Sequence, residues 1–370
     1  MRAACSRAAS GATVFLSKDA QVCAPSQRPS IRDTVNAPCN NLAMKIAILN
    51  DYLKRSQISA DWTKIAETCD ITVFDRAIAP DDAALTLKPY DIICTLRERM
   101  PITRELLAQL PNLKMIAITG LYNRTLDVAA ATEQGIIVSF TELRGTYRKA
   151  TCELTWGLIL SVARQIPLEA GKMRRGGWQN SVGFTLAGRT LGLLGLGRQG
   201  RHMVPVAKAF GMDVIAWSPN LTAQAAERYG VKRVEKDALF SAADVLTVHL
   251  VLGERSRGMV GERELALMKP KAILVNAARG PIVDEAALIH ALREGRIAGA
   301  GLDVFAVEPL PDDSPLRTLP NVVLTPHQGH NVQEFFEVAY ADVVQNIAAF
   351  LSGNPIRILT AARNVSALQD

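Results

Sequence analysis

The chain has 370 residues, which is enough for about two domains with ordinary hydrophobic cores. Hydrophobic residues make up 48% and charged residues 21% of the sequence, as in a soluble globular protein, and no apolar run is long enough to span a membrane. The net charge is +6, but lysine and arginine form no run and few aromatic residues lie among them. Neither nucleic acid nor a membrane is therefore expected as a partner.

The six cysteines form no CxxC pair and no cluster with histidine at the spacing of zinc ligands. In a chain of this length such cysteines are expected to be free thiols in a reducing compartment. We therefore expect a cytoplasmic protein without disulfides and without a metal site.

Residues 1–43 differ in composition from the rest of the chain. They are rich in Ala, Ser, Pro, Arg and Asn, and they carry five basic against two acidic residues. No sustained helical or strand period is present before Met44, where a short apolar run begins. We interpret this segment as a disordered extension, or as the result of a start codon assigned too early. An organelle transit peptide is the weaker alternative.

From Met44 onward, short apolar runs alternate with helix-like stretches. Strands are predicted at 44–51, 71–74, 91–96, 113–119 and 136–140, with a helix at 126–134 among the connections. This alternation predicts a parallel sheet covered by helices on both faces. A long helix is predicted at about 150–165, with Pro167 just after it.

A second series of strands follows the long helix. These strands are predicted at 190–194, 213–217, 244–250, 272–276, 299–305 and 322–325. Six parallel strands with short connections form a complete doubly wound sheet, and a helical stretch at 332–351 comes after it. The predicted fold class is therefore α/β, with two doubly wound parallel-sheet domains.

A glycine-rich loop joins the first strand of the second series to a helix. Gly195, Gly197 and Gly200 match the G-x-G-x-x-G pattern of dinucleotide-binding domains. The first glycine allows a tight turn, the second lets the backbone approach the pyrophosphate, and the third lets helix and strand pack closely. Because strand, loop and helix occur in the expected order, we predict that this loop binds a dinucleotide cofactor.

The next strand lacks the acidic residue that usually binds the adenosine ribose. Ser218 stands at about the expected distance beyond the glycine loop. Without a carboxylate a 2′-phosphate is not repelled, yet no arginine or lysine follows before Arg228 to bind one. The sequence thus leaves the choice between NAD(H) and NADP(H) open.

One candidate catalytic residue follows each of the last three strands of the second series: Arg279, Glu308 and His327. The carboxyl ends of the strands in an open α/β sheet point into the binding crevice, so these side chains are expected to converge. Each residue alone could have a structural role. Their occurrence after three successive strands favours a joint role.

The three residue types suit the reduction of a 2-oxo acid. A guanidinium can bind the carboxylate and polarise the adjacent carbonyl oxygen. Arrival of a hydride builds negative charge on that oxygen, and histidine can supply the proton near neutral pH. A carboxylate next to the histidine orients the ring and favours its protonated form.

From Met44 to about Ile358 the chain resembles the D-isomer-specific 2-hydroxyacid dehydrogenases. The resemblance rests on the glycine loop, on His249-Leu250, and on the stretches Asn276-Ala-Ala-Arg-Gly280, Asp303-Val-Phe-Ala-Val-Glu-Pro309 and Pro326-His-Gln-Gly329. It implies that Arg279 binds and polarises the substrate, that His327 is the acid/base, and that Glu308 supports His327.

The resemblance also implies a cofactor site, a substrate site and an arrangement of domains. The implied cofactor-binding residues are Gly195, Gly197, Arg198, Gln199, Gly200, Ser218, His249, Ala277, Asp303 and Gly329, and Arg97 and Gly120 join Arg279 at the substrate. A flavodoxin-like substrate domain would span 44–145, completed by 331–360, and a Rossmann cofactor domain would span 146–330, with 361–370 as a tail. Catalysis would take place in a cleft between the domains, and a homodimer would form through the cofactor domain.

Some features leave alternatives open. The loop from Gly120 to Asp127 is bulkier than the family's glycine-rich substrate loop, which blurs the choice of substrate. An NAD(H)-sensing module on the same fold is the main alternative function. Formate oxidation is a second alternative, but relatives with that activity pair the histidine with glutamine rather than with a residue such as Glu308. His330 lies close to His327 in sequence without an evident partner.

Overall fold

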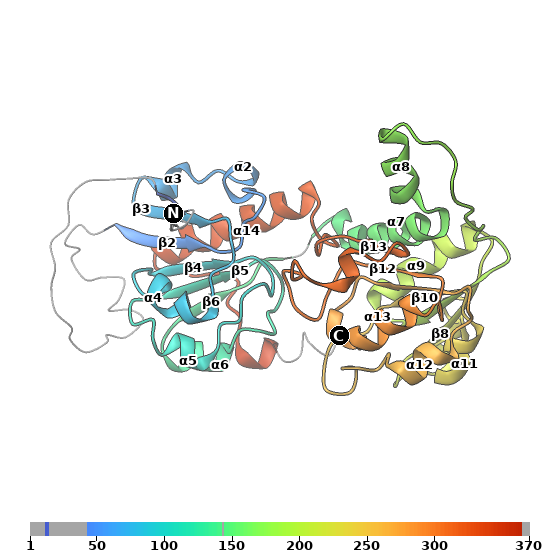
Figure 1. Cartoon of the computed structure of the whole chain (residues 1–370). Coiled ribbons are helices and arrows are strands. Elements are labelled where there is room, and N and C mark those ends of the chain that lie inside the picture. Colours follow the sequence, from blue (N-terminus) through green and yellow to red (C-terminus); the bar gives the residue numbers. More distant parts are fainter. Residues whose placement is uncertain (1–11, 15–42, 143, 365–370) are drawn as a thin grey trace. The chain divides into compact units, whose positions relative to one another are not determined.

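The computed structural model describes residues 12–14, 43–142 and 144–364 (Figure 1). The described residues divide into two compact units. The described residues within Met1–Gly145 and Val332–Asp370 form the first unit, and those within Thr146–Asn331 form the second. Each unit is built around its own sheet, so each is described by itself.

The first unit has five parallel strands in the order β3-β2-β4-β5-β6, the flavodoxin-like order. The strands are β2 (Met44–Ile48), β3 (Cys69–Phe74), β4 (Ile92–Thr95), β5 (Met115–Ile118) and β6 (Ile137–Ser139). The helices are α2 (Ser56–Ser59), α3 (Thr63–Ala66), α4 (Ala83–Leu87), α5 (Arg104–Leu107), α6 (Val128–Glu133) and α14 (Gln333–Leu351). All five predicted strands of this series are confirmed.

A sixth strand lies inside the segment that was predicted to be a disordered extension. β1 (Ala12–Val14) pairs antiparallel with β3, in a register that places Ala12 opposite Phe74. The remainder of that segment up to residue 42 lies outside the described residues. A strand of three residues gives too short an alternation to be recognised in the sequence.

The second unit has seven parallel strands in the order β13-β12-β11-β10-β7-β8-β9. The strands are β7 (Thr190–Leu194), β8 (Asp213–Trp217), β9 (Lys232–Arg233), β10 (Val245–Val248), β11 (Ile273–Asn276), β12 (Gly299–Leu302) and β13 (Val322–Leu324). The helices are α7 (Ala150–Arg164), α8 (Ile166–Arg174), α9 (Arg198–Ala209), α10 (Ala223–Glu227), α11 (Lys236–Ala242), α12 (Glu262–Leu267) and α13 (Glu285–Arg293). The six predicted strands are confirmed, and the two-residue edge strand β9 was missed.

Helices cover both faces of the second sheet. Successive residues of β7 belong to different hydrophobic clusters: Leu193 packs with α7 and α9, whereas Leu194 packs with α11, α12 and α13. Adjacent side chains of a strand point to opposite faces, so the two clusters lie on opposite sides of the sheet. This burial on both faces explains why the strands of this unit are nearly continuous apolar runs.

α7 ends within one residue of the predicted position, but the chain after it differs from the prediction. Gln165, the C-cap of α7, has a φ of 51°, and the chain then starts a second helix, α8, with Pro167 in its first turn. Proline is tolerated there because its missing N–H would have no intrahelical partner. Figure 1 shows α8 and the loop after it standing clear of the sheet of this unit.

The strand order of the second unit reverses between β7 and β10, which are hydrogen-bonded neighbours. In such sheets the crevice outside the carboxyl ends of these two strands is the usual place for a ligand. Gly195 follows β7 and His249 follows β10, so the glycine loop lies at this switch point. None of the helices in the described part of the chain combines the length and apolar character needed to cross a membrane.

We expect β1 to stabilise the first unit modestly. A variant that lacks residues 1–43 should fold, with its free energy of unfolding lowered by about 1–3 kcal/mol because a few strand hydrogen bonds are lost. Urea denaturation followed by circular dichroism measures this difference. A variant that lacks only residues 1–11 keeps β1 and is the matched control. Equal stability of the two variants would contradict a role for β1.

Candidate active site

A histidine and a glutamate form a pair in the turns after β13 and β12. Nδ1 of His327 lies 2.6 Å from Oε2 of Glu308, and the two side chains are 29% and 34% exposed. Phe305 donates its backbone N–H to Oε1 of Glu308 over 3.0 Å. The carboxylate is thus held at both oxygens, and Nε2 of the imidazole remains available for a reacting group.

Several effects act on the pKa of Glu308. Burial raises it, whereas the hydrogen bond and charge of His327, the N–H of Phe305 and the charge of Arg279 lower it, and the result lies below the ordinary glutamate value. Glu308 is therefore ionised at neutral pH. Its negative charge stabilises a protonated imidazole beside it.

The backbone of His327 lies in the left-handed region, with a φ of 53°. Its N–H donates to the carbonyl of Asp303 over 2.8 Å. The Asp303 carboxylate accepts hydrogen bonds from the hydroxyl of Thr325 and from the N–H groups of Gln328 and Gly329, over 2.6, 2.7 and 2.9 Å. Residues with a side chain rarely adopt this conformation because it costs free energy. The hydrogen bonds to Asp303 offset this cost and hold the histidine in place.

Asp303 is fully buried. Burial raises the pKa of its carboxyl above the ordinary aspartate value, although the hydrogen bonds and the nearby His327 act in the opposite direction. Both carboxylate oxygens of Asp303 accept hydrogen bonds from the segment around His327. The role of Asp303 at the cofactor stays a prediction.

Arg279 lies in the turn after β11, and Asn276 braces this turn. Nδ2 of Asn276 donates to the carbonyl of Arg279 and its Oδ1 accepts from the N–H of Ala278, each over 3.0 Å. Nη1 of Arg279 donates to the carbonyl of Ala278 over 2.7 Å. The side-chain amide of Asn276 therefore supplies the hydrogen bonds that the backbone of this turn lacks once the strand has ended.

The Arg279 turn packs closely against the loop that carries Glu308. A Cβ built on Gly280 would overlap the backbone of Phe305, so the turn can close on this loop only because residue 280 is glycine. The charge of Arg279 is also among the causes that lower the pKa of Glu308. The structure thus brings together all three residues that the sequence analysis assigned to catalysis.

The glycine loop fits the pyrophosphate of a dinucleotide. A Cβ on Gly200 would overlap the carbonyl of Gly195, and a Cβ on Gly195, whose φ is 109°, would lie 2.9 Å from the backbone of His249. Gly197 is the N-cap of α9, and a Cβ there would meet no atom within 4 Å. Packing therefore requires two of the glycines, and the third leaves space at the positive end of a helix, where an anion binds.

Other predicted cofactor residues make contacts within the protein. Oε1 of Gln199 accepts a hydrogen bond from the thiol of Cys152 on α7 over 3.0 Å. Burial lowers the pKa of His249 to about 4, so its ring is neutral at physiological pH. The carbonyl of Gly329 accepts from the hydroxyl of Thr151 over 2.9 Å. Gln199 and Gly329 are thus each held by a side chain of α7.

The remaining predicted cofactor residues differ in accessibility. Arg198 is exposed in the first turn of α9, Ser218 is half-buried after β8, and Ala277 is buried after β11. Contact of these residues with the cofactor stays a prediction.

The predicted substrate residues of the first unit lie at the carboxyl ends of β4 and β5. Arg97 has a φ of 56°, its N–H donates to the hydroxyl of Thr119 over 2.9 Å, and its Nη1 donates to the carbonyl of Thr119 over 3.3 Å. A Cβ on Gly120 would overlap the guanidinium of Arg97, so this glycine makes room for the arginine. Their contact with substrate rests on the resemblance and stays a prediction.

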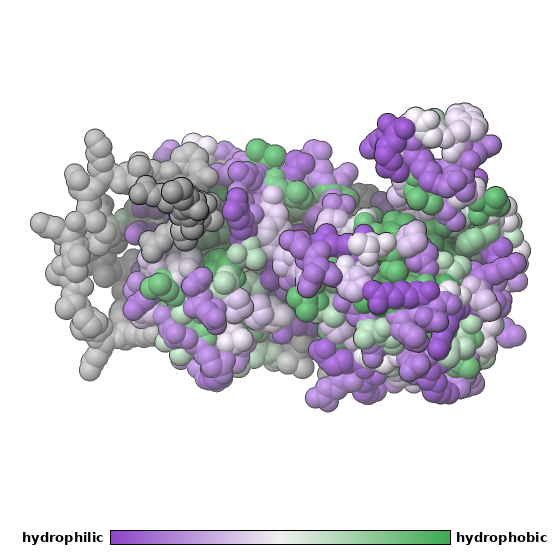
Figure 2. Space-filling view, in the orientation of Figure 1, coloured by the Kyte–Doolittle hydropathy of each residue, from purple (hydrophilic) through white to green (hydrophobic). Residues whose placement is uncertain are grey.

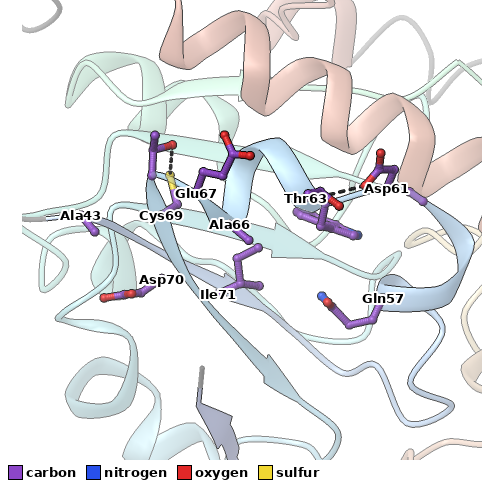
Figure 3. A pocket seen from close by; sticks show the side chains of 12 residues that line it. Ala43, Gln57, Asp61, Thr63, Ala66, Glu67, Cys69, Asp70 and Ile71 are labelled. Carbon is purple, nitrogen blue, oxygen red and sulfur yellow. Dashed lines mark hydrogen bonds between the residues drawn. The ribbon is translucent and has the colours of Figure 1, made fainter. Parts of the chain in front are cut away.

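The first unit also contains a pocket of about 410 Å³ (Figure 3). Its lining includes Trp62 and Cys69 together with the carboxylates of Asp61, Glu67 and Asp70. None of the predicted catalytic, cofactor or substrate residues lines it. The pocket is therefore separate from the candidate active site.

Two structural partners at the site were not recognised from the sequence. Asn276 stands in the same stretch as Arg279, but its bracing role appears only in the turn geometry. His330 places its ring edge-on to the ring of His327, with centroids 5.7 Å apart and an interplanar angle of 83°. In the sequence, the only sign of this contact is that His330 comes three positions after His327.

Comparison with known proteins agrees with this geometry. Residues 156–329, within the second unit, match the model of the D-isomer specific 2-hydroxyacid dehydrogenase NAD binding domain. D-3-phosphoglycerate dehydrogenase of Methanocaldococcus jannaschii is 39% identical over 296 residues, which cover 79% of this chain and 56% of that protein. Glyoxylate reductase of Thermococcus litoralis is 40% identical over 261 residues, which cover 68% of this chain and 78% of that protein.

A solved structure of a related protein has the same fold. Phosphoglycerate oxidoreductase from Vibrio cholerae superposes with a TM-score of 0.77 at 35% identity, covering 83% of this chain and 98% of that one. The chain therefore belongs to the D-isomer specific 2-hydroxyacid dehydrogenase family, and its second unit is the NAD-binding domain.

Proposed function

We propose that the protein transfers a hydride between NAD(P)H and a small 2-oxo acid, forming a D-2-hydroxy acid, or catalyses the reverse reaction. The observation that carries this proposal is the 2.6 Å hydrogen bond between His327 and Glu308, next to the Arg279 turn. A carboxylate-supported imidazole is a general acid and base for a carbonyl or hydroxyl group. The nicotinamide, when bound, supplies or accepts the hydride.

Arg279 binds the carboxylate of the oxo acid and polarises the adjacent carbonyl. Its planar guanidinium can donate two hydrogen bonds to a carboxylate, which fixes the substrate's orientation. The charge also stabilises the oxygen anion that develops as the carbonyl is reduced. Bracing by Asn276 holds the backbone of Arg279 in one position before substrate arrives.

His327 donates a proton from Nε2 to the developing alkoxide and takes it back in the reverse reaction. Glu308 accepts the hydrogen bond at Nδ1, so it fixes the ring orientation and stabilises the imidazolium. The turn held by Asp303 keeps the imidazole in place during this proton transfer.

The substrate belongs to the range of small acids used by the relatives. One matched relative is named a D-3-phosphoglycerate dehydrogenase and another a glyoxylate reductase, and the chain spans 56% and 78% of their lengths. Glyoxylate, hydroxypyruvate and phosphorylated three-carbon acids are the substrates to test first. A pure NAD(H) sensor would not need the complete set of Arg279, Glu308 and His327, and Glu308 also disfavours formate oxidation.

We further propose a cytoplasmic homodimer formed through the second unit. The described cysteines Cys69, Cys94 and Cys152 are buried free thiols, as in a reducing compartment. The arm formed by α8 and the loop after it has no buried residue in its helix. It exposes Met173, Trp178 and Val182 by 53%, 72% and 93%.

Such exposed apolar side chains favour a protein partner, and a second copy of this chain is the partner that we propose. In Figure 2 the arm carries hydrophilic and less polar residues side by side, as in the rim of an interface. A symmetric pair of arms would bury the same side chains on both subunits.

A substitution in the glycine loop tests cofactor binding. Gly197→Ala should fold normally because its Cβ meets no atom, but it should raise the Kd of NADH by about 10- to 100-fold because the methyl group occupies the space over the helix N-terminus. Isothermal titration calorimetry measures this affinity. Gly157→Ala, at an exposed position of α7, is the matched control. Unchanged NADH affinity in Gly197→Ala would place the cofactor elsewhere.

Substitution of His327 tests the acid/base role. His327→Ala should lower kcat for reduction of the accepted oxo acid by about 10²- to 10⁴-fold while leaving NADH binding nearly unchanged. Consumption of NADH with a panel of 2-oxo acids measures kcat. Retention of most of kcat under chemistry-limited conditions would exclude His327 as the proton donor.

Glu308→Gln tests the support of the histidine in the same assay. This change keeps the shape but removes the anion that stabilises imidazolium, so the alkaline limb of the pH profile for reduction should move to lower pH. Glu285→Gln is a control, since Glu285 also accepts a backbone hydrogen bond from this loop, from Ala306 over 3.0 Å. An alkaline limb that stays in place in Glu308→Gln would show that Glu308 does not support His327.

The arm is tested by sedimentation. The wild-type protein, with a chain mass of 40.1 kDa, should sediment as a dimer, and Trp178→Ser combined with Val182→Ser should sediment as a monomer. Leu85→Ser removes an equally exposed apolar side chain from the first unit and should leave the dimer intact. A wild-type monomer at micromolar concentration would refute the proposal.

A further inference from the structure

The loop after β8 lacks a negative charge. It runs through Ser218 to Leu221, and none of its residues is acidic. In dinucleotide-binding domains a carboxylate at this place binds the ribose hydroxyls and repels a 2′-phosphate. Its absence permits a 2′-phosphate but does not by itself bind one.

A cation lies beside the glycine loop in the first turn of α9. Nε of Arg201 donates to the carbonyl of Leu196, between the first two glycines, over 3.1 Å. Its guanidinium lies 4.7 Å from the centre of the Tyr229 ring, which follows α10. The side chain is exposed and, within the part of the chain that the structure describes, forms no ion pair with a carboxylate.

Arg201 is bound to the glycine loop through Leu196, and this loop lies next to the end of β8, because the N–H of Gly195 donates to the carbonyl of Trp217 over 2.8 Å. Tyr229 follows α10, the helix to which the loop after β8 leads. Nε is used by the carbonyl of Leu196, and the guanidinium carbon lies over the Tyr229 ring. Little side-chain freedom is therefore left to lose when the remaining N–H groups bind an anion.

Two other cations of this region are less suited. Arg233 donates to the carbonyl of Leu221 over 2.9 Å, but its charge is paired with Glu235 at 2.6 Å. Lys208 lies 3.5 Å from the carbonyl of Tyr229, in the last turn of α9. At about 1.5 Å per residue its Cα is roughly 10 Å farther along the helix than that of Arg201. Its Nζ contacts the backbone after α10 and not the glycine loop.

We infer that Arg201 binds the 2′-phosphate of NADP(H), so that the protein accepts NADPH as well as NADH. This inference rests on the proposed function, because it assumes that the glycine loop holds a nicotinamide dinucleotide. An arginine is suited to a phosphate dianion because its planar fork donates two hydrogen bonds to two oxygens. The signal was hard to find in the sequence because the cation precedes β8 instead of following it.

Direct binding tests the inference without any turnover. Isothermal titration calorimetry with NADPH, NADH and the fragment 2′,5′-ADP gives the three affinities. Arg201→Ala should raise the Kd of NADPH and of 2′,5′-ADP by about 10- to 100-fold and change that of NADH by less than about threefold. Arg201→Lys should recover part of the loss, and Ser218→Asp should penalise NADPH far more than NADH.

The control variants separate the possible outcomes. Lys208→Ala removes one positive charge from the same helix and should leave the NADPH affinity within about threefold of the wild type, as expected for a screened surface charge. Equal weakening of NADH and NADPH in Arg201→Ala, or a selective loss of NADPH in Arg233→Ala instead, would overturn the inference. Wild-type protein that binds NADH but neither NADPH nor 2′,5′-ADP would also overturn it. Failure to bind either dinucleotide would instead refute the proposed function.

Discussion

The buried carboxylate of Asp303 holds the turn that carries His327, and the geometry of the candidate active site depends on it. His327 has a left-handed backbone, which costs free energy for a residue with a side chain. Hydrogen bonds from Thr325, Gln328 and Gly329 to the carboxylate offset that cost. A buried carboxylate is tolerated only when its oxygens are satisfied, so the turn and the aspartate stabilise each other.

The other parts of the site are positioned relative to this turn by close backbone approaches. β11, β12 and β13 are parallel neighbours, so the segments that follow them emerge at the same edge of the sheet. Gly280 lets the Arg279 turn contact the loop of Phe305, and the N–H of Phe305 in turn holds Glu308. The arginine, the carboxylate and the imidazole are thus fixed by backbone packing before a substrate binds.

The second unit separates the binding of phosphate from the chemistry at the carbonyl. The glycine loop follows β7 at the switch point of the sheet, and the Arg279, Glu308 and His327 segments follow strands on one side of it. At the loop, backbone N–H groups of a helix N-terminus supply positive potential without a titratable group. At the other segments, side chains supply the charge, and the short hydrogen bond between His327 and Glu308 helps to lower the pKa of the glutamate.

Apart from β1, α8 and β9, the sequence alone determined the order of the strands and the long helices, the glycine loop and the three catalytic candidates, because each depends on local pattern. Buried parallel strands are apolar along their whole length, and a dinucleotide loop requires glycines at fixed spacing. The tertiary structure decided what depends on contacts between distant residues. These contacts include the pairing of β1 with β3, the bracing of His327 by Asp303, 24 positions earlier in the sequence, and the cation–π contact of Arg201 with Tyr229. Such contacts leave no periodic trace in a sequence, since either partner alone is an ordinary strand, loop or surface residue.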